Sequence, residues 1–154
     1  MNSEYALNSC KNLLETHLTS MILLIENETG ATYNAPTPKE FHFGERETDI
    51  MTDFPSIQII GRSSNSVDDQ YNYQDRSLKF EVIAWIIEED VEKLCRYILR
   101  YADAITKCLR KEDYWDVNLH NPVSSEAVYS GLYRTDFGLA KGCLINGSID
   151  YIIT

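Results

Sequence analysis

The sequence predicts an α+β domain in which two helices pack on a twisted, mostly antiparallel sheet of about five strands. Two long segments carry apolar residues at helical spacing, and several shorter ones alternate between apolar and polar residues as half-buried strands do. The predicted order along the chain is α-β-β-α-β-β-β, which suits a layer of helices on one sheet. With 154 residues the chain has the length of one domain, so we expect a single domain over 1–154.

The first predicted element is a helix over about residues 3–26. At about 100° per residue, one face of this helix is apolar. Its residues are Leu7, Cys10, Leu14, Leu18, Met21 and Ile25. Ser3 is the predicted N-cap, because its hydroxyl can accept a hydrogen bond from a free N–H of the first turn. His17 lies at the margin of the apolar face, and we interpret it as a packing residue because no second metal ligand lies one turn away.

Residues 27–53 show no periodicity and predict a long, mobile loop. They include a glycine, two prolines and many charged residues. Loops of this length without structure of their own are uncommon in compact domains and tend to be functional or disordered. Two interpretations stay open: a partner orders the loop, or the loop is a flexible insertion.

The next segments predict a hairpin, with a short strand over 54–60, a polar loop over 61–75 and a clear strand over 76–87. One face of the second strand is apolar throughout: Leu78, Phe80, Val82, Ala84 and Ile86. The other face begins with Lys79 and Glu81 but continues with Ile83, Trp85 and Ile87. Strands that are apolar on both faces are usually covered on both. We therefore expect a second cover near Trp85, for which a neighbouring subunit is a candidate.

A second helix is predicted over about residues 89–111, roughly 33 Å at 1.5 Å per residue. Its core-facing stripe is Val91, Leu94, Cys95, Ile98, Ala102, Ile105 and Leu109. Acidic residues 88–90 and the basic pair Arg110 and Lys111 complement the helix dipole at the two ends.

The face of this helix opposite the stripe gathers basic residues, with Asp103 among them. They are Lys93, Arg96, Arg100, Lys107 and Arg110. A solvated helix face is one interpretation. A nucleic-acid surface is disfavoured by the net charge of −10 and by the lack of aromatic residues between the cations. The third interpretation is a contact with an acidic face of the next subunit, a heterologous contact of the kind that forms rings.

The remainder of the chain predicts strands. Trp115, Val117 and Leu119 alternate with polar residues, a turn is expected at Asn121-Pro122, and residues 127–135 form another strand. The final apolar positions are Cys143, Ile145, Ile149, Tyr151 and Ile153. Asn146-Gly147 is a hairpin signal, but the alternation passes through it unbroken. One long strand and a hairpin are both possible, and we favour one strand.

No catalytic, cofactor-binding or metal-binding pattern is present in the sequence. The motifs GxxxxGK[ST], GxGxxG, HExxH and GxSxG do not occur. His42 stands among carboxylates, but on the expected loop, where we interpret the cluster as solvated. Cys10, Cys95, Cys108 and Cys143 are widely spaced, and the N-terminus does not resemble a signal peptide. We therefore expect free, mostly buried thiols, an intracellular protein that is not an enzyme, and a function carried by protein–protein contacts.

One stretch resembles a known family. Residues 79–105, KFEVIAWIIEEDVEKLCRYILRYADAI, form a strand that ends in Trp85 and a helix with Asp-x-Glu-x-Leu and Tyr-Ala-Asp-Ala-Ile patterns. Together with FPSIQIIGRS at 54–63 and the β-rich end after Asp136, they resemble the tail-terminator (tail-completion, tail-to-head joining) proteins of long-tailed bacteriophages. The resemblance extends from Phe54 to the C-terminus.

This resemblance implies a structural virion protein at the head–tail junction, present in the host cytoplasm before assembly. Such proteins form a hexameric ring on the last ring of the tail tube, stop its polymerisation and join the head connector. DNA passes through the lumen without specific binding, as an acidic channel favours. The expected interface residues are Lys93, Arg96, Arg100, Lys107, Arg110, Ile83 and Trp85. The alternatives are another neck or head-completion ring protein and, in a different class, a small acidic regulator that binds a protein.

Overall fold

The computed structural model describes residues 2–45, 53–68 and 74–153. The helical elements are α1 (Ser3–Thr29), α2 (Val91–Arg110) and the short 3-10 helix η2 (Glu112–Tyr114). The strands are β1 (Glu40–Phe43), β2 (Ser56–Asp68), β3 (Gln74–Glu88), β4 (Leu119–Ser124), β5 (Val128–Tyr129), β6 (Tyr133–Thr135) and β7 (Gly138–Ile153).

The strands form one open, mixed sheet in the order β1-β2-β3-β7-β4, and β5 and β6 also pair with β7. Strand β1 runs parallel to β2, and every other pairing among the described residues is antiparallel. The centre of the sheet is the long ladder of β3 and β7, in register from Gln74 opposite Ile153 to Glu88 opposite Leu139. The predicted class, two helices on a mostly antiparallel sheet, is confirmed.

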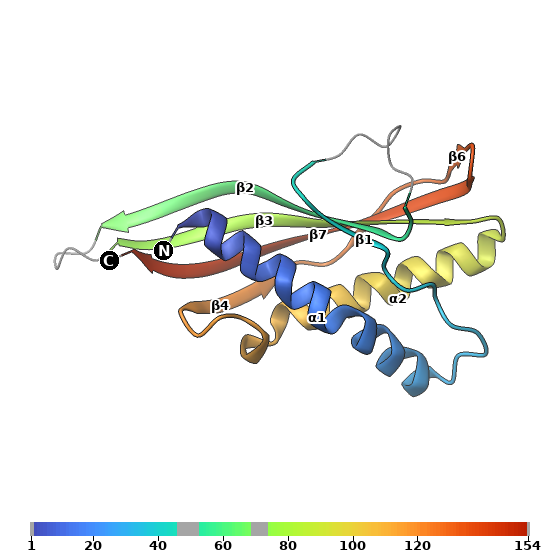
Figure 1. The fold of residues 1–154 in the computed structure, drawn as a ribbon, viewed down its shortest axis with the longest axis horizontal. Coiled ribbons are helices and arrows are strands. Elements are labelled where there is room, and N and C mark those ends of the chain that lie inside the picture. Colours follow the sequence, from blue (N-terminus) through green and yellow to red (C-terminus); the bar gives the residue numbers. More distant parts are fainter. Residues whose placement is uncertain (1, 46–52, 69–73, 154) are drawn as a thin grey trace.

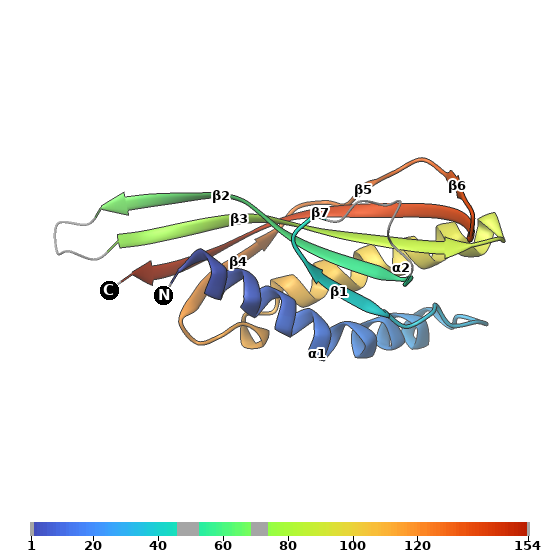
Figure 2. The same ribbon diagram turned by 45° about the horizontal axis from the view of Figure 1, so that its top comes forward.

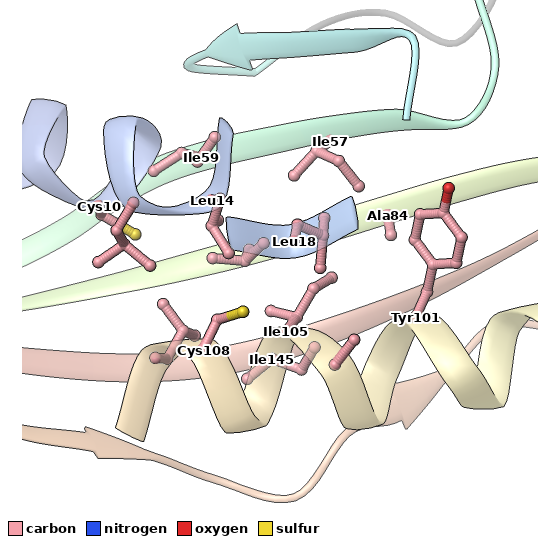
Figure 3. Close-up of a cluster of buried hydrophobic side chains, with 14 of the residues drawn as sticks. Cys10, Leu14, Leu18, Ile57, Ile59, Ala84, Tyr101, Ile105, Cys108 and Ile145 are labelled. Carbon is pink, nitrogen blue, oxygen red and sulfur yellow. The ribbon is translucent and has the colours of Figure 1, made fainter. Parts of the chain in front are cut away.

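Both helices cover the same face of the sheet, as the two views in Figures 1 and 2 show. The core lies between the layers. Figure 3 shows side chains from both helices and from the central strands pointing into it: Cys10, Leu14, Leu18, Ile57, Ile59, Ala84, Tyr101, Ile105, Cys108 and Ile145. The apolar stripes of the two helices and the alternating strands together bury this cluster, whose removal from water stabilises the fold.

Helix α1 starts and ends differently from the prediction. Asn2, not Ser3, is the N-cap, and its side chain accepts a hydrogen bond from the backbone N–H of Tyr5 at 2.9 Å. The Ser3 hydroxyl instead shares a 2.7 Å hydrogen bond with the Tyr151 hydroxyl on β7. The helix continues past residue 26 to Thr29, because Gly30 supplies the left-handed conformation (φ 64°) that ends it.

Helix α2 keeps its predicted core face. Asp90 is the N-cap, and its carboxylate accepts a 3.1 Å hydrogen bond from the N–H of Lys93. Of the predicted stripe, Leu94, Ile98, Ala102, Ile105 and Leu109 are buried. Cys95 is only half-buried, and Val91 is exposed, because the first turn of the helix lies at one end of the molecule (Figure 1).

Of the loop expected over 27–53, residues 30–39 indeed have no helix or strand, but residues 27–29 belong to α1 and residues 40–43 form β1. Residues 31–39 form a strap that runs from the C-terminal end of α1 over the first half of α2, and β1 follows it (Figure 2). Glu26 accepts a 2.9 Å hydrogen bond from the N–H of Ala35, and the Tyr101 hydroxyl donates to the carbonyl of Pro36. These tertiary contacts hold the segment against the helices, although its sequence has no helix or strand periodicity. Residues 46–52 of the expected loop lie outside the described residues.

The described part of the predicted polar loop over 61–75 is strand, and residues 69–73 lie outside the described residues. Strand β2 continues to Asp68, and β3 begins at Gln74, with pairs from Gly61 opposite Phe80 to Asp68 opposite Gln74. The pairing of backbone groups extends the ladder here. The prediction depended on the pattern of side chains, which does not show how the backbone groups of this segment pair.

Two strands of the C-terminal part were predicted wrongly at their boundaries. Trp115 follows η2 and donates its indole N–H to the carbonyl of Leu109 at 2.9 Å, while Val117 is 86% exposed. Strand β4 therefore starts only at Leu119. The expected turn at Asn121-Pro122 lies inside β4 as a register shift between His120 and Val123.

The strand predicted over 127–135 is divided into β5 and β6, which pair with separate parts of β7. The last segment is one long strand, as favoured, with Gly147 paired to Phe80 in mid-strand. Cys143, Ile145, Ile149 and Tyr151 are buried as predicted. The expectation for the side chain of Ile153 lies outside the described residues.

Candidate interaction surface

The sheet face opposite the helices, called the outer face here, is covered by neither helix (Figures 1 and 2). Successive residues of a strand point to opposite faces, so β3 turns Leu78, Phe80 and Val82 into the core. Its outward-facing residues Ile83, Trp85 and Ile87 are half-buried. The sequence predicted that these apolar residues need a second cover. Among the described residues that cover is incomplete.

Trp85 is the largest side chain of the outer face. It lies on Gly142 of β7, where a Cβ atom would be only 2.9 Å from Trp85 Cε3. The ring of Tyr133 meets it edge-on, with centroids 6.0 Å apart. Leu144 on β7 and Val128 on β5 continue the apolar surface next to Ile83. This cluster is rigid and aromatic, the composition typical of interface cores.

One end of the molecule exposes a second group of apolar residues. Leu132, Tyr133 and Phe137 lie around β6 and its turn into β7, and Phe137 is 64% exposed. The acidic turn Glu88–Asp90 lies beside them: a Cβ atom at Gly138 would be 3.0 Å from Glu89 Oε1. We call residues 88–90 and 132–137 the acidic–aromatic end. Sequence reasoning missed it because residues 127–135 were interpreted only as a further strand and residues 136 and 137 were assigned no role.

A groove of about 530 Å³ crosses the more polar half of the outer face. Its floor comes from β2, β3 and β7, and its wall includes Val123 and Ser125. The polar lining residues are Arg62, Ser63, Lys79, Glu81, Ser125, Asn146 and Ser148. Glu81 and, from outside the lining, Glu45 both pair with Arg62, so Lys79 is the lining cation that forms no ion pair with a described residue, in a chain whose net charge is −10.

A strand irregularity places Arg62 in this groove. The register of β2 against β3 shifts between Gly61 and Ser63, which leaves Arg62 as the extra residue of a β-bulge. Its guanidinium bonds to Glu45 at 2.8 Å and to Glu81 at 2.5 Å. Lys79, exposed on the neighbouring strand, forms no ion pair within the described part of the chain.

The predicted basic face of α2 is only partly a surface. Arg96, Lys107 and Arg110 are exposed. Arg96 pairs with Glu92 at 2.9 Å on the same helix, and Arg110 donates to Ser124 Oγ at 2.8 Å. Asp103 is exposed among them.

Arg100 and Lys93 lie elsewhere than predicted. Arg100 points under the strap, donating a 2.9 Å hydrogen bond to the carbonyl of Tyr33. It lies 3.7 Å from the carboxylate of Glu26, whose side chain is 2% exposed. The ammonium of Lys93 sits 5.3 Å from the centre of the Tyr33 ring. The expectation that Arg100 belongs to the solvated face is therefore wrong, because the strap covers that flank of the helix.

The described residues contain no group of three or more His, Cys, Asp and Glu side chains that could hold a metal ion. The four cysteines are free, and three of them are buried. Burial raises the pKa of Cys108 and Cys143 to about 12, so neither thiol is a nucleophile near neutral pH. His17 stacks on Tyr114 with ring centroids 3.6 Å apart, which makes it a packing residue.

In the part of the chain that the structure describes, no helix has the length and apolarity to cross a membrane. The fold is that of a small α+β protein in which neither helix covers the outer face of the sheet. No model of a known protein family matches the chain, and no curated protein matches it.

Proposed function

We propose that the chain is a structural virion protein, a tail terminator that forms a ring on the end of a phage tail tube and joins it to the head connector. The proposal rests on the resemblance of residues 54–154 to that family. It is supported by one observation above the others. The outer face presents Ile83, Trp85 and Leu144 without a helix above them, and a neighbouring subunit would cover it.

The charge of the chain suits this function. A lumen lined by carboxylates repels phosphate, so DNA passes through without binding. The excess of Asp and Glu over Lys and Arg, which gives the chain its net charge of −10, supplies such carboxylates. The proposed partners are further copies of the chain, the tail tube protein and the head connector. No enzymatic step is part of the proposal.

The test is the mass of the purified chain by light scattering, before and after mixing with tail tubes. We expect a six-fold mass or capture at tube ends, seen by electron microscopy. Ile83→Asn should reduce assembly without altering the circular dichroism spectrum. Val117→Asn is the matched control, because Val117 is exposed on a segment away from the outer face.

Other outcomes assign other functions. Co-purification with filled heads instead of headless tails would favour a different neck protein. A monomer that ignores tubes and captures one host or viral protein would overturn the ring and favour the small acidic regulator.

A further inference from the structure

The two surfaces described above are complementary to each other in chemistry. The acidic–aromatic end combines exposed apolar side chains with carboxylates, and the groove region combines an apolar row with cations. They also lie at different places along the long axis of the molecule, because Glu88 ends β3 whereas Lys79 lies toward its start (Figure 1). The groove and the carboxylates of the end therefore cannot meet within one copy of the chain, although Tyr133 of the end packs on Trp85 of the apolar row.

The acidic component of the end is available for a partner. Glu88 accepts hydrogen bonds from the N–H groups of Glu89 and Asp90, and Asp90 caps α2. Glu89 is exposed and forms no ion pair with any described residue. Three carboxylates in succession thus leave a negative end next to the apolar residues Tyr133 and Phe137.

The groove offers the matching chemistry. Lys79 has no ion-pair partner among the described residues, and Arg62 lies beside it, paired with Glu45 and Glu81. Hydroxyl and amide groups surround both cations. On the same strand as Lys79, Ile83 begins the apolar part of the outer face. An occupant that carries carboxylates and aromatic side chains together would satisfy both parts, because ionic and apolar contacts would form side by side.

We infer that the occupant is a second copy of this chain, whose acidic–aromatic end docks on the groove and the adjoining apolar row. The inference rests on the proposed function and names its subunit contact. Since the two surfaces differ, the contact is heterologous: each copy uses its end toward one neighbour and its groove toward the other. Such a contact closes into a ring when the rotation between copies permits.

The contact differs from the one that the sequence suggested, which used the basic face of α2. Lys107 on that face and Lys79 in the groove are both exposed, and neither forms an ion pair within the described part of the chain. Lys79→Glu and Lys107→Glu therefore make the same change of charge on the two competing surfaces. We expect the first to weaken assembly by about tenfold or more and the second to leave it unchanged.

The decisive experiment mixes two variants. Lys79→Glu damages the groove but keeps the end, and Phe137→Ser damages the end but keeps the groove. Each variant alone should be a monomer by light scattering. Their mixture should form a dimer that cannot grow, because only one end and one groove remain intact. Adding Glu89→Lys to Lys79→Glu should restore part of the assembly.

The controls separate this inference from the proposed function. Val117→Ser is the control for Phe137→Ser, since both remove an exposed apolar side chain. If Lys79→Glu and Phe137→Ser both still form the ring that the wild-type chain forms, this contact is overturned but the proposed ring is not. Monomers in the mixture, beside a wild-type ring, also overturn it. A wild-type chain that stays monomeric at high concentration, alone and with tubes, overturns both.

Discussion

Arg100 and Glu26 face each other beneath the strap of residues 31–39, with 3.7 Å between the guanidinium and the carboxylate. Arg100 is 12% exposed and also donates a hydrogen bond to the carbonyl of Tyr33, while Glu26 accepts one from the N–H of Ala35. The pair joins α1, α2 and the strap. It thereby fixes the position from which β1 enters the sheet.

Loss of the Arg100 side chain should destabilise the protein strongly. Arg100→Ala leaves the buried carboxylate of Glu26 without its cation, and breaking a buried pair in this way costs about 3–5 kcal/mol. Arg96→Ala, one turn earlier on the same helix, should cost less than about 0.5 kcal/mol because its pair with Glu92 is exposed. Urea denaturation of both variants measures the difference. Equal losses would contradict the assignment of Arg100 to the strap.

The close approach of Trp85 to β7 predicts the effect of a single methyl group. Gly142→Ala should displace the indole ring and destabilise the fold by about 1–3 kcal/mol, the usual cost of overpacking. Gly131→Ala is the control, because no atom lies within 4 Å of a Cβ there. Thermal unfolding followed by circular dichroism compares them. A neutral Gly142→Ala would show that Trp85 does not rest on the strand.

The thiols should differ in reactivity. Burial raises the pKa of Cys108 and Cys143 to about 12, and it also raises the pKa of Cys10, whereas Cys95 is only half-buried. We expect a thiol reagent at pH 8 to label Cys95 first, with the site read by mass spectrometry. Raising the pH to about 9 should not speed the other three, because their thiols stay protonated. Rapid labelling of Cys143 in the folded protein would disprove this, and labelling of the urea-unfolded chain is the control.

The contact between Tyr5 and Asp116 predicts a pH effect. The Tyr5 hydroxyl donates a hydrogen bond to the Asp116 carboxylate and lowers the pKa of that group below 3.8; the backbone N–H of Asn118 acts in the same direction. A lowered folded-state pKa stabilises the protein above the unfolded value, and this stabilisation disappears as the pH falls through the folded one. Tyr5→Phe should raise the pKa of Asp116 toward 3.8 and weaken the loss of stability in acid.

An NMR titration of the Asp116 carboxyl measures this pKa directly. Tyr129→Phe is the matched control, because Tyr129 lies on β5 and has no hydrogen bond to Asp116 among the described residues. An unchanged titration in Tyr5→Phe would show that the backbone N–H of Asn118 alone lowers the pKa.

The candidate surface was only half predictable from the sequence. Ile83 and Trp85 were found because an apolar run on both faces of a strand is a local signal. Lys79 and Arg62 were not found as a groove. Their proximity depends on a bulge in β2 and on the order of the strands, and neither is encoded in the residue pattern of one segment.

By itself, the sequence determined the elements whose signal is local. The core face of α2 and the inward positions of β3 follow from periodicity, since each repeats its own geometry along one segment. The alternation through Asn146-Gly147 favoured the single strand β7 without excluding a hairpin. Only the tertiary structure decided the strap, the place of Arg100 and the acidic–aromatic end. Those depend on contacts between residues far apart in the chain, such as Tyr33 with Arg100 and Glu89 with Gly138. The periodicity of a single segment cannot predict such contacts.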